Sequence, residues 1–168
     1  PHKRAEVGMS YLPQEPSIFR NLSVKKNILG VAERNFLKKE DLINFYQNTI
    51  TEFGLESIED TMGYVLSGGQ RRKVEIARCL ASKPKIILLD EPFAGIDPLA
   101  IQDIKNVLKS LSDKGICILI TDHNLRETID ICNYSIVIKD GSILDKGEKD
   151  YLINSSLIKE EYFGTVFD

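Results

Sequence analysis

The chain has 168 residues, of which 42% are hydrophobic and 28% charged, with a formal net charge of −3. These proportions are typical of a folded globular domain and exclude a disordered chain, a collagen-like fibre and a low-complexity tail. The net negative charge provides no basic field for nucleic acid, so we expect no nucleic-acid partner. Aliphatic runs such as Ile86–Leu89 are far shorter than the roughly 20 residues of a bilayer span, so we expect no transmembrane helix.

In the first half of the chain, the pattern predicts one strand and then a helical region. Residues 6–12 have the pattern of a strand, which ends at Pro13 because proline cannot donate a ladder hydrogen bond. From about Ser23 to Gly54, apolar residues recur at spacings of three and four, and Gly54 is a typical C-terminal stop for a helix. Short basic clusters, among them residues 71–73, are interpreted as solvated helix faces.

In the second half, strands and helices alternate. The predicted strands cover 86–89, 117–121 and 135–138, and the predicted helices cover 98–115 and 124–132. The first two strands are apolar enough to be buried on both faces of a parallel sheet. The third turns at Asp140-Gly141 into an antiparallel hairpin with residues 142–146. This order predicts an α/β sheet with right-handed crossovers, to which a helical subdomain at residues 23–83 is attached.

The cysteines and the first residue bear on the origin of the chain. Cys79, Cys117 and Cys132 form no Cys-x-x-Cys pair and are typical of reduced, buried thiols in a cytosolic protein. The chain begins with Pro1 rather than Met, and no signal peptide follows. We therefore expect a further segment to precede Pro1 in the native protein.

Two consecutive carboxylates, Asp90 and Glu91, follow the predicted strand at 86–89. The carboxyl edge of an α/β sheet commonly binds ligand, and adjacent carboxylates repel each other unless a cation or a catalytic task requires them. In a nucleotide hydrolase, Asp90 would hold Mg²⁺ through water and Glu91 would polarise the attacking water. The alternative is that the pair only caps a turn before Pro92.

A second motif, Ser67-Gly68-Gly69, leads into a helix predicted from about Arg71 to Ser82. The glycines would let the backbone approach a ligand closely, and the helix N-terminus would direct its N–H groups at it. Ser67 adds a hydroxyl donor. The motif indicates a phosphate-binding loop, and the alternative is a plain loop with a serine helix cap.

Together these motifs resemble the ATP-binding cassette ATPases. Leu66–Gln70 is similar to the family's signature loop, and Ile86–Glu91 to its Walker B strand. In the expected order, Gln14 resembles the Q-loop glutamine, Asp97 lies in a stretch that resembles the D-loop, and His123 resembles the switch histidine. The resemblance implies a partial P-loop NTPase (RecA-like) core with a mainly parallel sheet and an inserted α-helical subdomain.

The resemblance also implies roles for the matched residues. Glu91 and His123 would be catalytic, and Mg²⁺ would be held by Gln14 and, through water, by Asp90. ATP contacts would come from seven residues: Gln14, Ser67, Gly68, Gly69, Gln70, Asp90 and Asp97. Apart from the motif order, His123 would be an ordinary surface residue, and Asp97 is also expected to cap the helix that follows it.

One family motif, the Walker A loop, has no counterpart here. It requires Gly-x-x-x-x-Gly-Lys-[Ser/Thr], and the sequence contains no Gly-Lys dipeptide. The loop lies upstream of the Q-loop in the family, so we expect this chain to be the C-terminal part of a longer ATPase and inactive alone. The expected divisions of this one partial domain are 1–15 for the core strand and Q-loop, about 16–83 for the helical subdomain with the signature loop, and about 84–168 for the remaining motifs.

Longer strings resemble one group within the family, the ATPase subunits of lipopolysaccharide exporters. These strings are residues 8–20, 121–128 and 158–164, with Phe167 beyond. The resemblance implies a homodimer that closes over two ATP molecules and drives two transmembrane permease subunits, moving lipopolysaccharide from the inner to the outer membrane. It also implies a cytoplasmic protein, peripheral on the inner membrane, that contacts the membrane only through its partners.

Three other assignments stay open. The ATP subunit of branched-chain amino-acid importers shares the Pro-Gln stretch and a similar tail, although its switch region usually differs. Non-transport cassette ATPases share the core motifs but usually carry two cassettes or a long coiled coil. A regulatory cassette without hydrolysis is disfavoured because Glu91 and His123 are both present.

A partner surface is expected after the Q-loop. The apolar residues there show no helical or strand period: Pro16, Ile18, Phe19 and Leu22. The resemblance implies that they line a groove for a coupling helix of the membrane subunit. The alternative is a loop tucked against the helical subdomain.

Overall fold

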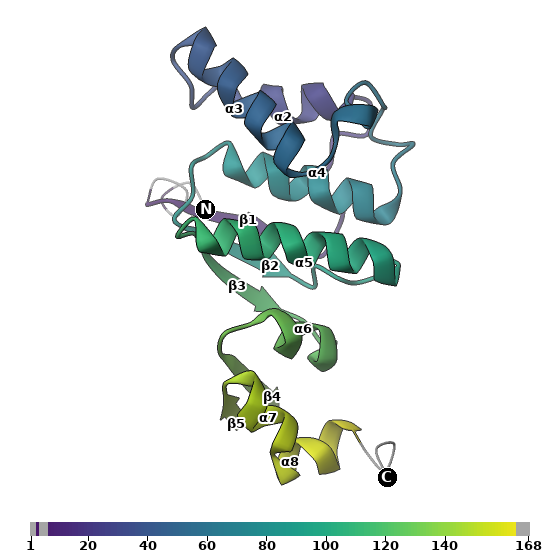
Figure 1. Ribbon diagram of the computed structural model, residues 1–168, viewed down its shortest axis with the longest axis vertical. Helices are drawn as coiled ribbons and strands as arrows, with labels where there is room; N and C mark the ends of the chain where they lie inside the picture. Colours follow the sequence, from purple (N-terminus) through teal and green to yellow (C-terminus); the bar gives the residue numbers. More distant parts are fainter. Residues whose placement is uncertain (1–2, 4–6, 164–168) are drawn as a thin grey trace. The chain divides into compact units, whose positions relative to one another are not determined.

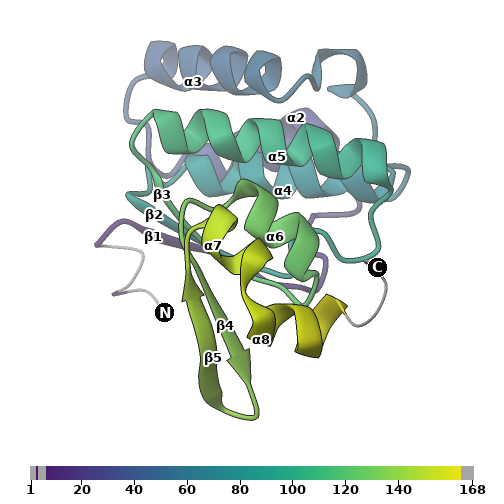
Figure 2. The same ribbon diagram turned by 60° about the horizontal axis from the view of Figure 1, so that its bottom comes forward.

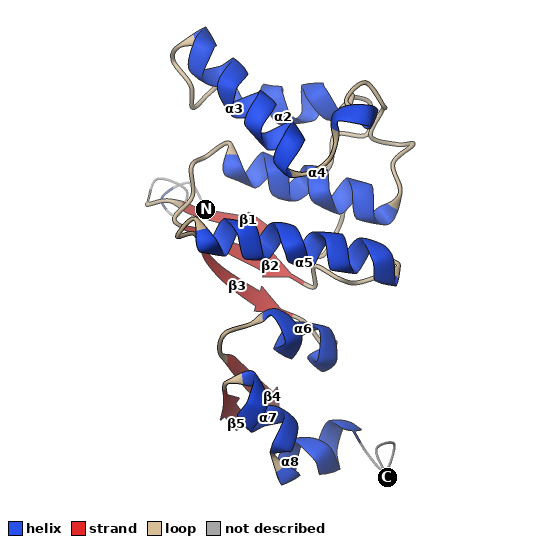
Figure 3. Ribbon diagram, viewed as in Figure 1, coloured by secondary structure: helices blue, strands red, loops and turns tan. Residues whose placement is uncertain are grey.

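The computed structural model describes Lys3 and residues 7–163. The chain divides into two compact units, one ending at Thr121 and the other beginning at Asp122. Figure 3 shows that each unit combines helices with strands. None of the helices in the described ranges is long and apolar enough to cross a bilayer.

The first unit is built on a three-stranded parallel sheet. Its strands are β1 (Met9–Leu12), β2 (Ile86–Asp90) and β3 (Cys117–Thr121), in the order β1-β2-β3. The parallel pairing brings all three carboxyl ends to one edge. The two later strands confirm their predicted positions; the first is confirmed from Met9 onward, and Glu6, its predicted start, lies outside the described residues.

Helices cover one face of this sheet (Figures 1 and 2). The helices against the strands are α4 (Gly68–Leu80) and α5 (Pro98–Asp113). Beyond them lie α2 (Val24–Ala32), α3 (Lys39–Glu52) and the short 3₁₀ helix η1 (Glu56–Ile58), with α2 packed on both α4 and α3. Side chains at most 1% exposed form the core between sheet and helices: Leu12, Ile87, Leu89, Ile104 and Leu108.

The helix boundaries follow from local sequence signals. Ser23 accepts a hydrogen bond from the Lys26 N–H at the start of α2. The helical region predicted between Ser23 and Gly54 is interrupted, because a turn follows α2 in which Asn35 donates its N–H to the Ala32 carbonyl. The second helix, α3, ends just before Gly54, whose φ of +58° lies in the left-handed region that favours glycine.

The opposite face of the sheet corrects one prediction. Tyr11 is 58% exposed and Leu119 56% exposed, and the residues of β3 alternate between exposed and half-buried. Successive side chains of a strand point to opposite faces, and the four helices described above for this unit, α2 to α5, lie on one of them. The prediction that residues 117–121 form a strand buried on both faces is therefore wrong, and Cys117 is an exposed thiol rather than a buried one.

The second unit packs short helices on a hairpin. Its elements are α6 (Leu125–Ile131), β4 (Ser135–Lys139), β5 (Ser142–Gly147), α7 (Lys149–Asn154), α8 (Ser156–Ile158) and the π-helical turn η2 (Lys159–Phe163). Its core consists of four buried residues: Ile129, Val137, Leu152 and Ile158. Gly164 and Phe167, which belong to the tail resemblance, lie outside the described residues.

The predicted hairpin is confirmed, but the prediction that its first strand belongs to the parallel sheet is wrong. The turn between β4 and β5 uses Asp140 (φ +49°) and Gly141 (φ +76°), and two central residues with positive φ match the twist of an antiparallel pair. The two strands form a sheet of their own. The third predicted strand therefore pairs with its nearest neighbour in the sequence and does not extend the parallel sheet.

Candidate functional site

Asp90 lies at the carboxyl end of β2 and accepts hydrogen bonds from both neighbouring strands. Tyr11 Oη donates to its Oδ2 at 3.1 Å, and Thr121 Oγ1 donates to its Oδ1 at 2.7 Å. The hydrogen bond to the Asp90 carboxylate raises the pKa of Tyr11 above its ordinary value. Each carboxylate oxygen has two acceptor positions, so both retain capacity for water or a cation.

Glu91 contacts Gln14 across the edge of the sheet. Gln14 Nε2 donates to Glu91 Oε2 at 2.7 Å, although the two residues are 77 positions apart. The Glu91 N–H donates to the Thr121 carbonyl at 2.7 Å, and the Glu91 backbone then turns with a φ of +43°. A left-handed conformation costs a non-glycine residue about 1–2 kcal/mol, and such strain is concentrated at functional sites. The structure thus brings together Glu91, predicted to polarise the attacking water, and Gln14, predicted to hold Mg²⁺.

The predicted signature loop begins helix α4 with a reciprocal cap. The Gln70 N–H donates to Ser67 Oγ at 3.2 Å, and the Ser67 N–H donates to Gln70 Oε1 at 3.0 Å. This capping box starts the helix at Gly68, three residues earlier than predicted. The serine helix cap, the alternative interpretation of this loop, is therefore present. Roles for Ser67 and Gln70 in binding ATP stay predictions.

The two glycines of this loop have different surroundings. A Cβ at Gly69 would lie 2.3 Å from the Cβ of Ala100, so glycine at this position lets α4 cross α5 closely. A Cβ at Gly68 would meet the Gly95 carbonyl oxygen at 3.5 Å, an ordinary contact. Helix packing thus accounts for Gly69 without a ligand, and the contact at Gly68 places the signature loop beside the predicted D-loop.

Asp97 and His123 lie at the starts of two further helices. Asp97 Oδ1 accepts from the Ala100 N–H at 3.0 Å, which confirms the predicted cap of α5. His123 belongs to the second unit, with a side chain 75% exposed and its Nδ1 3.8 Å from Asp122 Oδ1. Contacts of Asp97 or His123 with ATP stay predictions.

A buried ion pair on α4 is a feature that the sequence analysis missed. Arg72 and Glu75 are 5% and 3% exposed, with Nη1 and Oε2 3.4 Å apart. The interpretation of residues 71–73 as a solvated face is therefore wrong for Arg72. A signal was present: opposite charges three residues apart lie in a stretch that also contains the apolar residues Val74 and Ile76.

The chemistry of the donors fits Mg²⁺. Asp90 and Glu91 provide carboxylates, and Gln14 keeps its amide oxygen because its nitrogen is the donor to Glu91. Mg²⁺ prefers oxygen ligands and is usually bound by one or two carboxylates together with waters and substrate phosphates. Within the described residues, no cluster of three or more His, Cys, Asp or Glu side chains could hold a metal ion.

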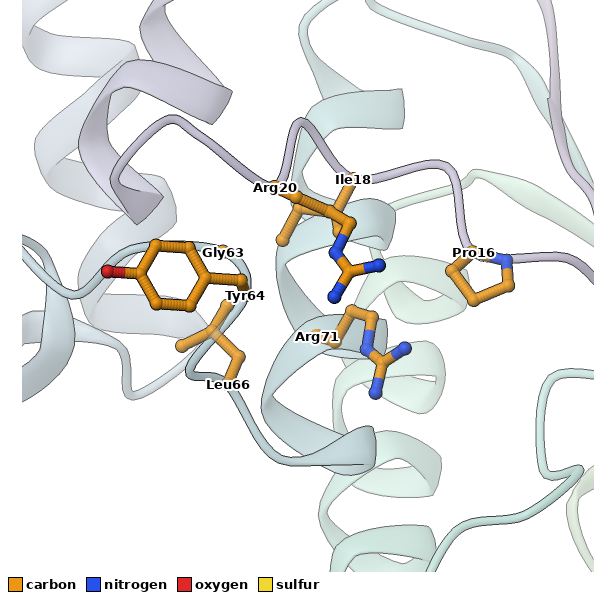
Figure 4. A pocket seen from close by; sticks show the side chains of 7 residues that line it. All are labelled: Pro16, Ile18, Arg20, Gly63, Tyr64, Leu66 and Arg71. Carbon is orange, nitrogen blue, oxygen red and sulfur yellow. The ribbon is translucent and has the colours of Figure 1, made fainter.

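A cavity of about 350 Å³ lies beside the segment that follows Gln14 (Figure 4). Figure 4 shows that Arg20 and Arg71 both line this cavity. The remaining lining residues are Pro16, Ile18, Gly63, Tyr64 and Leu66. Phe19 and Leu22, which were also predicted to line a groove, are 48% and 37% exposed and do not line this cavity.

Comparison with known proteins identifies relatives over almost the whole chain. Residues 1–94 match the family model described as "ABC transporter". The lipopolysaccharide export system ATP-binding protein LptB of Haemophilus influenzae is 46% identical over 167 residues, which are 99% of this chain and 69% of that protein. The protein of the same name from Escherichia coli (strain K12) is 45% identical, with the same coverage.

Solved structures agree with this relationship. The structure of cbiO1 from Clostridium perfringens, part of the ABC transporter complex cbiONQ, has a TM-score of 0.82 at 26% identity and covers 93% of this chain and 63% of its own. The ADP conformation of MJ1267, an ATP-binding cassette of an ABC transporter, has a TM-score of 0.79 at 26% identity, with 98% and 71% covered. These likenesses confirm the predicted fold class and family resemblance. This chain belongs to the ABC transporter family, whose ATPases bind ATP.

Proposed function

We propose that this protein is the ATP-hydrolysing subunit of a lipopolysaccharide exporter. The hydrolytic part rests on the hydrogen bond between Gln14 and Glu91 at the edge of the sheet, 2.7 Å long. The transported substrate rests on the 46% and 45% identity to two proteins named as lipopolysaccharide export system ATP-binding proteins.

In the proposed mechanism, each residue of the site has one task. Glu91 accepts a proton from the attacking water, and Gln14 holds the Glu91 carboxylate in place through its amide hydrogen bond. Asp90, oriented by Tyr11 and Thr121, holds Mg²⁺ through water. The metal, when bound, neutralises charge on the phosphates of ATP. His123 donates to a γ-phosphate oxygen.

The proposed assembly is a homodimer bound to two transmembrane permease subunits. Ser67, Gly68 and Gly69 of one subunit cover the nucleotide that the other subunit holds, and Asp97 communicates across the interface. The expected divisions at residues 1–15, about 16–83 and about 84–168 are part of this proposal. The protein is then cytoplasmic and peripheral, held at the inner membrane by its partners.

The cavity beside Arg20 and Arg71 is the proposed contact for a permease helix. Two arginines in the lining favour a carboxylate, and the apolar lining from Pro16, Ile18 and Leu66 favours an aliphatic side chain. A short helix that carries one acidic residue beside apolar ones matches this surface.

Reconstitution tests the function. The full-length gene product, assembled with its two permease subunits in proteoliposomes, should release lipopolysaccharide only when ATP is supplied. The matched control is the same assembly with the Glu91→Gln variant, which should release none. ATP-driven uptake of leucine without movement of lipopolysaccharide would contradict the proposal and support an amino-acid importer.

A further inference from the structure

Three charged side chains on one face of α4 bind the backbone of residues 13–18, here called the Q-loop segment. Arg72 Nη1 donates to the Pro13 carbonyl at 2.9 Å. Glu75 Oε1 accepts from the N–H groups of Ser17 and Ile18, at 2.7 and 3.1 Å. Arg78 Nη1 donates to the Ser17 carbonyl at 2.6 Å. Residues three apart lie on the same face of a helix, so these three side chains fix both ends of the Q-loop segment to α4.

Arg72 also reaches the other half of the site. Its Nη2 donates to the Asp90 carbonyl at 2.8 Å, while its Nη1 holds Pro13. Pro13 and Asp90 directly precede Gln14 and Glu91. A single guanidinium therefore bridges the two backbone positions from which the hydrogen-bonded pair extends.

The burial of this bridge makes its geometry specific. Arg72 is 5% exposed, and its charge is matched by Glu75, which is 3% exposed. Water therefore cannot readily replace a lost hydrogen bond to either carbonyl. The planar fork of arginine serves two acceptors in fixed directions, whereas the ammonium of lysine is a compact charge at the end of a flexible stem.

We propose that Arg72 is a positioning residue for ATP hydrolysis. By donating to both the Pro13 and the Asp90 carbonyl, its guanidinium sets the spacing of Gln14 and Glu91. Glu75 fixes the guanidinium and the far end of the Q-loop segment. Arg72 lies on the helix that Ser67 and Gly68 begin, so a displacement of the signature loop is passed to Gln14. This inference rests on the proposed ATPase function.

The first test compares Arg72→Lys with Arg34→Lys in the full-length gene product. Arg34 is exposed, so its variant applies the same chemical change away from the site. Arg72→Lys should lower kcat roughly ten- to a hundredfold, the scale of loss for misplaced catalytic groups, with KM for ATP within about threefold. Arg34→Lys should change neither constant. An unchanged kcat in Arg72→Lys would overturn the inference.

A double-mutant cycle separates positioning from general stability. In a Gln14→Ala background, Arg72→Lys should lower kcat by less than about threefold, because the hydrogen bond that Arg72 positions is already lost. An equal loss in both backgrounds would show that Arg72 supports only the fold, and would overturn the inference. If Arg72→Lys fails to fold, the same comparison is made with Glu75→Gln. The glutamine oxygen at position 75 can still accept from the Ser17 and Ile18 N–H groups, whereas the negative charge beside Arg72 is removed.

The outcome also separates this inference from the proposed function. If the full-length gene product without substitutions hydrolyses no ATP, both the inference and the proposed function fail. If it hydrolyses ATP and Glu91→Gln abolishes the activity while Arg72→Lys retains the original kcat, the proposed hydrolysis stands and only the role of Arg72 is rejected.

Discussion

Glu91 is the residue on which the proposed hydrolysis depends most directly. Glu91→Gln keeps the size of the side chain and an oxygen acceptor but removes the basic carboxylate. Turnover in the full-length gene product should fall by roughly 10²–10⁴-fold, the usual contribution of a general base, while ATP still binds. Phosphate release measures the first effect and calorimetry the second. Exposed Glu33→Gln is the matched control, and near-normal turnover in Glu91→Gln would reject Glu91 as the base.

Single residues also show where sequence reasoning reaches its limit. The position of Asp90 and Glu91 at the carboxyl end of a strand could be predicted, because one short string contains both the apolar strand and the two carboxylates. The family resemblance implied a role for Gln14 and one for Glu91, but the hydrogen bond between them was not predicted, since 77 positions separate them. The burial of Arg72 had a local signal, since Glu75 and apolar residues lie nearby in the sequence, and this signal was overlooked. Its hydrogen bonds to the Pro13 and Asp90 carbonyls come from distant segments, so no local pattern predicts them.

Among the helices and strands, the close crossing of α4 and α5 at Gly69 can be tested directly by substitution. Gly69→Ala would place a methyl group 2.3 Å from the Cβ of Ala100, so one helix must shift. We expect a loss of about 1–3 kcal/mol in the free energy of unfolding, the usual cost of overpacking, measured by urea denaturation.

Two further variants identify the cause of that loss. Gly68→Ala changes the neighbouring glycine, whose added Cβ would meet its nearest atom at 3.5 Å, and should be nearly neutral. In the double variant Gly69→Ala with Ala100→Gly, the colliding methyl group is gone, and the nearest remaining atom is the Cα of residue 100 at 3.6 Å. Most of the stability lost through the collision should return; an additive loss would instead point to a change within α4 itself.

The remaining element-scale differences have a common origin. The start of α5 was predicted well, because the signals of Asp97 and Pro98 act within a few residues. The start of α4 was predicted three residues too late, because the cap at Ser67 was considered only as an alternative to a phosphate-binding loop. The burial of residues 117–121 was predicted wrongly, because an apolar run does not specify whether one or both faces of the strand will be covered. Likewise, the sequence of β4 is compatible with either sheet, and pairing with β5 decides the outcome.

At the scale of the whole molecule, motif order predicted more than any single motif. The Q-loop glutamine, the signature loop, the Walker B strand, the D-loop stretch and the switch histidine resembled the family because they occur in its order over most of the chain. The comparisons confirm that family. Assembly with other subunits cannot be predicted from the order of motifs in this chain. It depends on surfaces whose partners lie outside this chain, so it has to be tested on a complex.

Phe19 has the structural features expected of a residue that binds such a partner. Its backbone is held by Asn27, a fully buried side chain whose Oδ1 accepts from the Phe19 N–H at 2.9 Å and whose Nδ2 donates to the Phe19 carbonyl at 3.0 Å. The ring lies 4.3 Å from the Arg78 guanidinium and is still 48% exposed. An aromatic side chain held rigidly but left half-exposed has the properties of an interface anchor.

Phe19→Ala in the full-length gene product should therefore weaken binding to the permease subunits by about 2 kcal/mol or more, the scale for truncating an anchor. The fold should lose less, because the cation–π contact with Arg78 contributes only about 0.5–1 kcal/mol at an exposed site and the Asn27 hydrogen bonds involve only the backbone. Co-purification with the permease subunits and the melting temperature of the isolated subunit measure these two effects. Tyr134→Ala removes a similarly exposed aromatic ring, 55% exposed in the second unit, and should leave co-purification unchanged. If Phe19→Ala co-purifies at the original yield, or lowers the stability of the isolated subunit as much as it lowers binding, the ring serves the fold and the partner surface lies elsewhere.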